Sequence, residues 1–286
     1  MRNVNEEVGC CSICFRGIFD DNNKFPLFTM QFAACIVAAV AVRAQPRHES
    51  EMTNQLLFGE IVQVLSDETN GWCMIQSMHD QYAGWTRLAQ LEMVDEQFAF
   101  ASHLVVLNCD GAGDSIQTDH GALQIPYGAT LAGFHKGKGK IGRFSYWYNG
   151  KGSQERTKKD TGYLEQFVNK WPGAPYLWGG RTIFGVDCSG LSQLVYKMAG
   201  IDLLRDARQQ ALQGEVVDFL QQARYGDLAF FDDEAGNIYH VGILISNARI
   251  VHAAGKVRVD GIDTEGIINI DTGQRTHRLR IIKRYF

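Results

Sequence analysis

Short apolar runs broken by polar residues follow one another from about Gln31 to residue 95. This pattern is typical of β-strands joined by turns. The runs are separated by residues that favour turns, namely Pro46, Gly59, Asn70, Gly71 and Gly84. A second series of short runs spans roughly residues 98–148. Both segments therefore predict all-β structure, whereas residues 1–29 show no sustained periodicity and predict little order.

From about residue 153 helical spacing is mixed with strand patterns. Four apolar residues at positions i, i+3, i+4 and i+7 predict one helix: Leu191, Leu194, Val195 and Met198. Asp187 precedes this helix as a candidate N-cap, and Gly200 follows it as a stop signal. Two β-branched runs downstream, residues 240–245 and 248–253, predict neighbouring strands. The C-terminal segment therefore predicts an α+β domain.

Cys188 lies in the first turn of this predicted helix. Unpaired N–H groups and the positive end of the helix dipole favour a thiolate there, and the thiolate is the nucleophilic form. Each of the two predicted strands carries one histidine, His240 or His252, and antiparallel pairing would bring these side chains together. A lone cysteine or histidine is more often an inert core residue. A nucleophile, a base and a residue that orients the base favour catalysis when they occur together.

These segments resemble the motifs of the NlpC/P60 family of cell-wall cysteine peptidases. The resemblance covers residues 153–286 and lies in four segments: residues 187–190, 226–231, 240–243 and 250–253. It implies a papain-like α+β fold in which the helix that carries the cysteine packs on an antiparallel sheet. It also implies that Cys188 is the nucleophile, His240 the base and His252 the third polar residue. No metal or other cofactor is expected.

The all-β part resembles bacterial SH3-like modules. Its motifs are Val42-Arg43-x-x-Pro46, Gly59-Glu60, Gly71-Trp72 and Tyr82-x-Gly84-Trp85, each weak alone but specific in this order. The resemblance predicts two all-β SH3-like barrels, the second more divergent, ahead of the catalytic domain. The predicted domains are an extension over residues 1–30, barrels over 31–95 and 96–152, and the NlpC/P60 domain over 153–286.

A peptidase preceded by two such modules resembles the NlpC/P60 branch that cuts the γ-D-glutamyl–L-diamino acid bond of peptidoglycan stem peptides. The resemblance implies that the first module closes the cleft, so that only peptides with a free N-terminal L-alanine fit. The residues expected to hold its ammonium group are Glu60, Tyr82 and Asp187. Those expected to face the γ-linked D-glutamate are Tyr176, Ser189 and Arg205, with Arg205 as a fork for the free carboxylate. Which diamino acid is accepted, diaminopimelate or lysine, stays open.

Ordinary roles compete with this interpretation. Glu60 can be a surface carboxylate beside a turn, and Tyr82 can pack across a strand. The whole chain can be a non-catalytic wall-binding protein, a secreted peptidoglycan hydrolase, or a related acyltransferase or amidase. The intact set of Cys188, His240 and His252 argues against the first, and the order of cysteine before histidine argues against permuted acyltransferases.

The composition fits a soluble protein with a core, since 45% of residues are hydrophobic and 21% are charged. A formal net charge of −4 does not indicate a nucleic-acid partner; the expected partners are peptidoglycan-derived peptides. Seven irregularly spaced cysteines argue against a disulfide framework. Cys11 and Cys14 have the spacing of half a zinc site, but no second half follows. The oligomeric state stays open.

One apolar run, over residues 32–44, resembles the middle of a signal peptide but is too short to span a membrane as a helix. Acidic residues precede it where a signal peptide is short and basic, and the run serves better as a first strand. We therefore expect a cytoplasmic bacterial protein. If the run acts as a signal peptide, the protein belongs to the cell envelope; Met30 is an alternative start.

Overall fold

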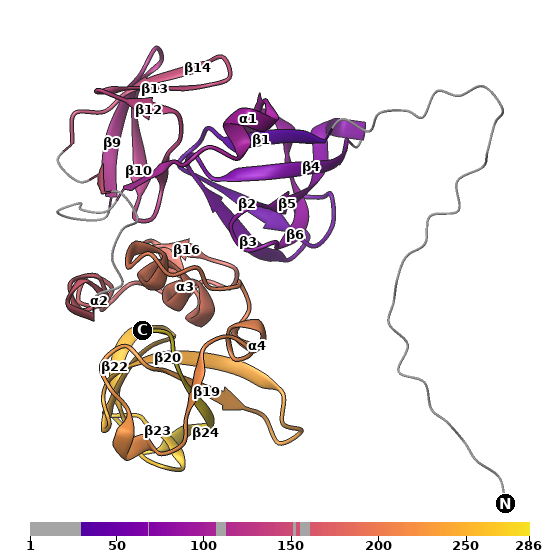
Figure 1. The fold of residues 1–286 in the computed structure, drawn as a ribbon. Helices are drawn as coiled ribbons and strands as arrows, with labels where there is room; N and C mark the ends of the chain where they lie inside the picture. Colours follow the sequence, from indigo (N-terminus) through magenta and orange to yellow (C-terminus); the bar gives the residue numbers. More distant parts are fainter. Residues whose placement is uncertain (1–29, 68, 107–112, 151–152, 155–160) are drawn as a thin grey trace, which may run out of the picture.

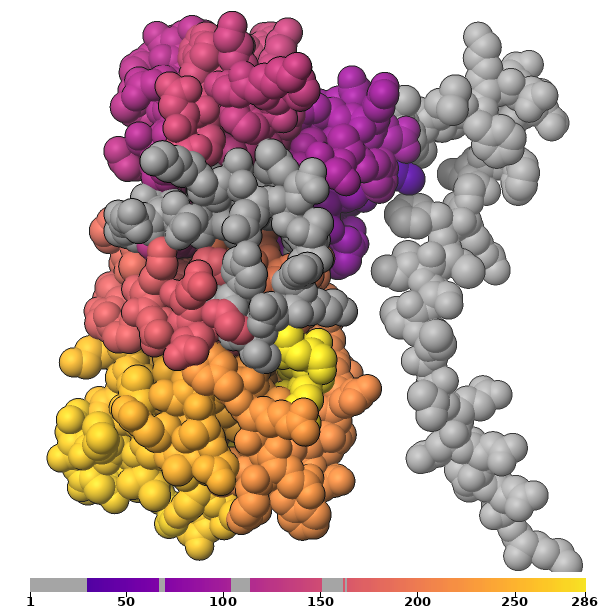
Figure 2. Space-filling model, turned by 60° about the vertical axis from the view of Figure 1, so that its left-hand side comes forward, coloured from indigo at the N-terminus to yellow at the C-terminus, as the bar shows by residue number. Residues whose placement is uncertain are grey.

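The computed structural model describes residues 30–286 except 68, 107–112, 151–152 and 155–160. The predicted N-terminal extension and the Cys11–Cys14 pair lie outside the described residues. Two β-rich parts are followed by a domain of mixed helices and strands. Figure 2 shows the β-rich parts toward one end of the molecule and the mixed domain at the other. Within the described part of the chain, no helix is long and apolar enough to cross a membrane.

The first β domain (residues 31–94) is one antiparallel sheet of seven strands. Its strands are β1 (Gln31–Cys35), β2 (Ala39–Arg43), β3 (Met52–Leu57), β4 (Ile61–Asp67), β5 (Trp72–Ser77), β6 (Ala83–Arg87) and β7 (Leu91–Val94), in the order β3-β2-β6-β5-β4-β1-β7. Inward-facing residues such as Ala33, Val42 and Ile75 are fully buried. The run that resembled a signal peptide forms β1 and β2, as predicted for a strand.

The middle β segment (residues 96–154) is also built from short strands, as predicted. Five of them, β9 (Gly113–Thr118), β10 (Gly121–Pro126), β12 (Phe134–His135), β13 (Lys138–Ile141) and β14 (Phe144–Trp147), form one sheet. The others, β8 (Leu104–Val106), β11 (Thr130–Leu131) and β15 (Ser153–Gln154), form a second sheet after the short helix α1 (Glu96–Ala99). Because β15 pairs with β8, residues 153–154 belong to this segment and not to the C-terminal domain.

The C-terminal domain (residues 161–286) has the expected α+β architecture. Its helices are α2 (Thr161–Val168), α3 (Cys188–Met198) and α4 (Ala207–Gln210), and β16 (Arg181–Thr182) pairs with β17 (Gly185–Val186). The main sheet has the order β18 (Glu215–Val217), β24 (Arg275–Arg284), β19 (Leu228–Asp232), β20 (Ile238–Ser246), β21 (Arg249–Ala254), β22 (Lys256–Ile262) and β23 (Gly266–Ile268). Helix α3 is buried along its whole length, between this sheet and the β-rich parts (Figure 1). Its apolar residues Leu191, Leu194 and Val195 are buried in one hydrophobic cluster with residues of the sheet and of both β-rich parts.

A buried cluster of charges joins α3 to both β-rich parts. Lys197 of α3 donates to Oε1 of Glu60 at 2.6 Å and to the carbonyl oxygen of Gly128 at 2.7 Å. Arg181 donates to both carboxylate oxygens of Glu60, at 2.8 and 2.9 Å. The three side chains are between 1% and 3% exposed. Glu60 therefore lies inside the junction of the domains, which contradicts both the predicted ammonium-binding role and the surface alternative.

Candidate active site

The N-terminus of α3 is fixed by Asp187, as the sequence predicts. Its Oδ1 caps the helix by accepting from the backbone N–H of Gly190 at 2.7 Å, and Oδ2 accepts from the N–H of Gly179 at 2.8 Å. Arg205 donates to both carboxylate oxygens, at 3.0 and 2.6 Å. This network holds Cys188, the first residue of α3, at one wall of a pocket.

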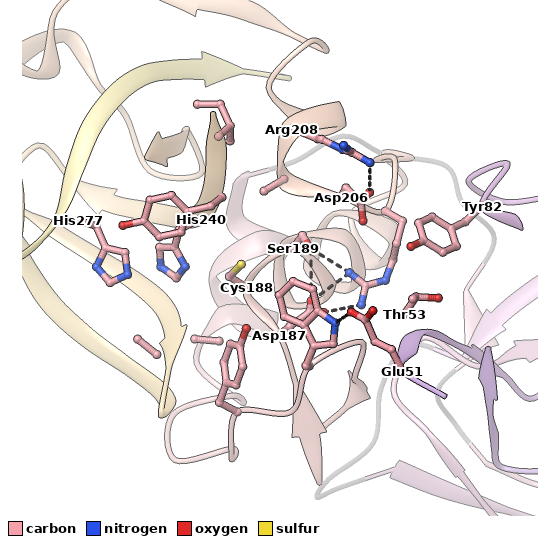
Figure 3. A pocket seen from close by; sticks show the side chains of 18 of the residues that line it. Glu51, Thr53, Tyr82, Asp187, Cys188, Ser189, Asp206, Arg208, His240 and His277 are labelled. Atoms are coloured by element: carbon pink, nitrogen blue, oxygen red, sulfur yellow. Dashed lines mark hydrogen bonds and ion pairs between the residues drawn. The ribbon is translucent and has the colours of Figure 1, made fainter. Parts of the chain in front are cut away.

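Strand pairing brings the two predicted histidines together. Strands β20 and β21 are antiparallel neighbours, and His252 lies opposite Gly242. Nε2 of His240 is 2.9 Å from Nδ1 of His252, and the rings meet edge to face. The thiol of Cys188 lies beside the ring of His240 (Figure 3). The structure therefore gathers Cys188, His240 and His252 in the order that a nucleophile, a base and an orienting residue require.

Asp260 extends this arrangement, although the sequence did not predict it as a site residue. Its Oδ2 is 3.0 Å from Nε2 of His252, and its Oδ1 accepts from Arg258 at 2.9 Å. A carboxylate oxygen can only accept from His252, so Nε2 of His252 carries a proton and Nδ1 accepts one from Nε2 of His240. This leaves Nδ1 of His240 with a lone pair for the thiol proton. The alternating segment before Asp260 was the available signal, since it predicted a strand at the edge of the sheet.

Asp260→Asn is expected to lower kcat by about 10²- to 10⁴-fold with a smaller change in KM. The amide can donate to His252, which would reverse the proton positions in both rings, as the corresponding change does in a serine protease triad. Steady-state kinetics with thermal unfolding of the variant measure this. Asp271→Asn is the control, because Asp271 also binds Arg258 but has no contact with His252. Equal effects of the two substitutions would show that Arg258, not the proton position, matters.

The electrostatics of Cys188 differ from the sequence prediction of a thiolate. Burial, and then the charge of Asp187, raise the pKa of the thiol to about 12, although the N–H groups of Val241 and Ser189 act in the opposite direction. Burial and the neighbouring imidazoles of His277 and His252 hold the pKa of His240 well below its ordinary value. These shifts favour a neutral thiol and a neutral imidazole in the free site, with the thiol deprotonated as it attacks.

This electrostatic state predicts how alkylation depends on pH. Because the thiol pKa is raised, the rate of Cys188 alkylation by iodoacetamide is expected to increase continuously from pH 6 to pH 10, without a plateau in the acidic range. Mass spectrometry of the peptide that contains Cys188 separates its reaction from that of the other cysteines. A rate that is already constant between pH 6 and pH 7 would show a resting thiolate–imidazolium pair instead.

The pocket has a volume of about 600 Å³ and lies where the first β domain meets the C-terminal domain. Figure 3 shows Cys188 and His240 between an end with Tyr82 and Glu51 and an end with His277. Of the predicted binding residues, those that line the pocket are Tyr82, Tyr176, Asp187, Ser189 and Arg205. Glu60 does not line the pocket. Glu51 does, although the sequence did not predict it as a site residue. Glu51 accepts from Nε1 of Trp178 at 2.6 Å.

Arg205 and Asp187 line the pocket, but they form an ion pair in which each largely neutralises the charge of the other. Arg205 also donates from Nε to Asn54 at 2.8 Å and from Nη1 to Ser189 at 2.9 Å. Four of the five guanidinium N–H groups are therefore occupied. Both side chains hold the helix terminus, and this role competes with the predicted roles of Arg205 as a fork and of Asp187 as an ammonium acceptor, which stay predictions.

Taken together, a cysteine at a helix N-terminus, an imidazole on the adjoining sheet and a polar chain behind it define a papain-like cysteine peptidase site. Residues 173–276 match the NlpC/P60 family, and residues 42–91 match the bacterial dipeptidyl-peptidase SH3 domain. Residues 173–276 thus form an NlpC/P60 domain that follows a bacterial SH3 domain, as the motifs predicted.

The similar proteins include a γ-D-glutamyl-L-lysine dipeptidyl-peptidase of Bacillus cereus, 36% identical over 37% of this chain and 33% of that protein. A protein of the same name from Bacillus subtilis is 42% identical over 28% of each chain. The chain thus aligns with about a third of the length of these relatives. Dipeptidyl-peptidase 6 of Lysinibacillus sphaericus is 25% identical over 81% of this chain and 92% of that protein. The crystal structure of an NlpC/P60 family protein from Bacillus cereus shares the fold, with a TM-score of 0.75 and 20% identity over 89% of this chain and 99% of that one.

Proposed function

We propose that this protein is a cysteine endopeptidase that hydrolyses the γ-D-glutamyl–L-diamino acid bond of small peptidoglycan-derived peptides with a free N-terminal L-alanine. The proposal rests mainly on which residues line the pocket, because Glu51 and Tyr82 of the first β domain border the same pocket as Cys188. The names of the Bacillus relatives support the choice of bond.

The pocket residues are suited to amide hydrolysis through an acyl-enzyme. Sγ of Cys188 attacks the carbonyl carbon while Nδ1 of His240 takes its proton, and His240 then gives that proton to the leaving amine. Water, deprotonated by His240, hydrolyses the thioester. The backbone N–H of Cys188 and the hydroxyl of Tyr176 are suited to stabilise the oxyanion. Burial raises the pKa of Tyr176 to about 12, so its hydroxyl remains a donor.

The end of the pocket formed with the first β domain is suited to hold an ammonium group. Glu51 and Asp206 place two carboxylates there, together with the hydroxyl of Tyr82. The Asp206 carboxylate takes part in the capping box of α4, and its salt bridge to the exposed Arg208 is long, 3.4 Å. Glu51 and Asp206 thus replace Glu60 in the predicted role.

The test compares L-Ala-γ-D-Glu-meso-diaminopimelate with the same peptide acetylated at its N-terminus. The wild type is expected to prefer the free peptide, and Glu51→Gln to reduce that preference by about 10- to 100-fold, the strength of one hydrogen bond to a charged group. The measured quantity is the ratio of kcat/KM for the two peptides. Glu49→Gln is the matched control, since Glu49 is exposed and does not line the pocket.

Equal cleavage of both peptides by the wild type would reject the requirement for a free amine and favour a hydrolase that acts on the intact wall. A requirement for free L-alanine restricts the substrate to small released peptides. On this basis we propose a role in cell-wall recycling in the bacterial cytoplasm.

A further inference from the structure

His277 is a third imidazole at the catalytic pair, and the proposed reaction does not use it. It lies on β24 and borders the pocket. Its ring stacks on that of His240 with centroids 4.1 Å apart and meets that of His252 edge to face at 5.6 Å. Three strands of one sheet, β20, β21 and β24, thus bring three imidazoles to one place. His277 lies in a charged stretch of the sequence that predicts no role for it.

Ring nitrogens of the three histidines converge. One nitrogen each from His240, His252 and His277 lies within 4.8 Å of the other two. Around a tetrahedral Zn²⁺, with Zn–N distances near 2.0–2.1 Å, neighbouring ligand nitrogens are about 3.3 Å apart. Nε2 of His240 and Nδ1 of His252 are 2.9 Å apart in a hydrogen bond, and the ring of His277 stacks on that of His240, so the rings have to separate and rotate before their lone pairs meet at one ion. The fourth position would be open to water from the pocket.

Asp260 completes the surroundings that a metal-binding imidazole needs. Histidine ligands usually donate their second ring nitrogen to a carboxylate or a carbonyl oxygen, which fixes the ring and raises its basicity. Nε2 of His252 already makes this contact with Asp260, at 3.0 Å. Its Nδ1, the atom that accepts from His240, is therefore the atom that can bind an ion.

We propose that His240, His252 and His277 form an inhibitory site for Zn²⁺ or a similar divalent cation that prefers imidazole ligands. The inhibitory effect rests on the proposed function, because the ion would disable the base assigned to His240. In the active form the single ring proton of His240 is on Nε2. An ion bound at Nε2 moves this proton to Nδ1, where no lone pair is then left for the thiol proton. Every imidazole stays neutral, and no proton is gained or lost.

A rival site can be distinguished by its ligands. A cysteine thiolate and Nδ1 of His240 could also hold Zn²⁺, but such a site needs the sulfur of Cys188 and does not need His277. The imidazole site needs His277 and does not need the sulfur. Removing each group separately therefore decides between the two sites.

The experiment is a titration of the full chain with Zn²⁺ by isothermal calorimetry. The protein carries Cys188→Ala, and its accessible thiols are first capped with iodoacetamide so that the N-terminal cysteines do not bind the ion. We expect one ion per chain. His277→Phe and His277→Gln are each expected to weaken binding by at least about tenfold, the loss that even an outer-shell change can cause. His120→Phe is the control, because His120 is exposed and does not belong to the cluster.

Thermal unfolding of the His277 variants shows whether they remain folded, and two replacements of different shape guard against a packing effect. Loss of binding in Cys188→Ala, or binding unchanged by both His277 variants, overturns the proposal. In protein with Cys188 intact, the concentration of Zn²⁺ that halves cleavage is expected to rise in His277→Gln by the same factor as the dissociation constant. If the chain cleaves no peptide but still binds Zn²⁺ through His277, the proposed function fails while the site stands.

Discussion

Cys188→Ala is expected to lower kcat/KM for L-Ala-γ-D-Glu-meso-diaminopimelate by at least about 10⁴-fold. The side chain supplies the atom that becomes bonded to the substrate, and removal of a covalent nucleophile costs this much or more in well-studied peptidases. Since Ala removes only one sulfur atom from the pocket wall, the dissociation constant of the peptide is expected to change little. Activity assays and calorimetric titration with the intact peptide measure the two quantities separately.

Cys73→Ala is the matched control for this prediction. Cys73 is fully buried in the core of the first β domain, where its Sγ donates to the carbonyl oxygen of Thr86, and it does not line the pocket. Its replacement is expected to leave kcat/KM within a few-fold of the wild-type value. If Cys188→Ala retained more than a hundredth of the activity, the reaction would not pass through a Cys188 acyl-enzyme, and His240 would have to activate water directly.

The sequence located the reactive centre because its signals are local. Cys188 follows a capping Asp187, and the two histidines lie on β-branched runs that could be recognised without knowledge of the fold. Pairing of β20 with β21 then brings His240 and His252 into contact. The α+β class and the β-rich N-terminal part followed from the same periodicities.

The residues that were missed depend on contacts between distant parts of the chain. Glu51 and Trp178 are 127 positions apart in the sequence and meet only because the first β domain packs beside the pocket. His277 reaches the site because β24 pairs with β19, a neighbour of β20. Periodicity indicates that these strands exist but not their order in the sheet.

Glu60 was misplaced for a related reason. The Gly59-Glu60 motif predicted a strand start correctly, and β4 begins at Ile61. It did not show which domain would cover the carboxylate. The cations that surround Glu60 come from positions 121 and 137 residues later in the chain. Its importance is therefore expected to lie in stability and not in recognition of the substrate.

Glu60→Gln is expected to lower the free energy of unfolding by about 3–5 kcal/mol at pH 7, because it leaves two buried cations without their anion. Arg181 and Lys197 are 1% and 3% exposed, so water can do little to replace the carboxylate. Urea denaturation followed by tryptophan fluorescence measures the change. Glu92→Gln is the control: Glu92 binds Arg143, whose side chain is 93% exposed, and its loss is expected to cost less than about 1 kcal/mol.

The pH dependence gives this prediction a second test. Burial alone would raise the pKa of Glu60, but the charges of Arg181 and Lys197 overcome burial and hold it well below its ordinary value. When the pH falls below about 4.3, the unfolded chain takes up a proton at Glu60 before the folded chain does, so the stabilisation by the carboxylate declines. The difference in stability between wild type and Glu60→Gln should therefore shrink by up to about 1.4 kcal/mol for each pH unit below that value. A difference that stays constant between pH 7 and pH 3 would show that the variant is destabilised by packing and not by the loss of a charge.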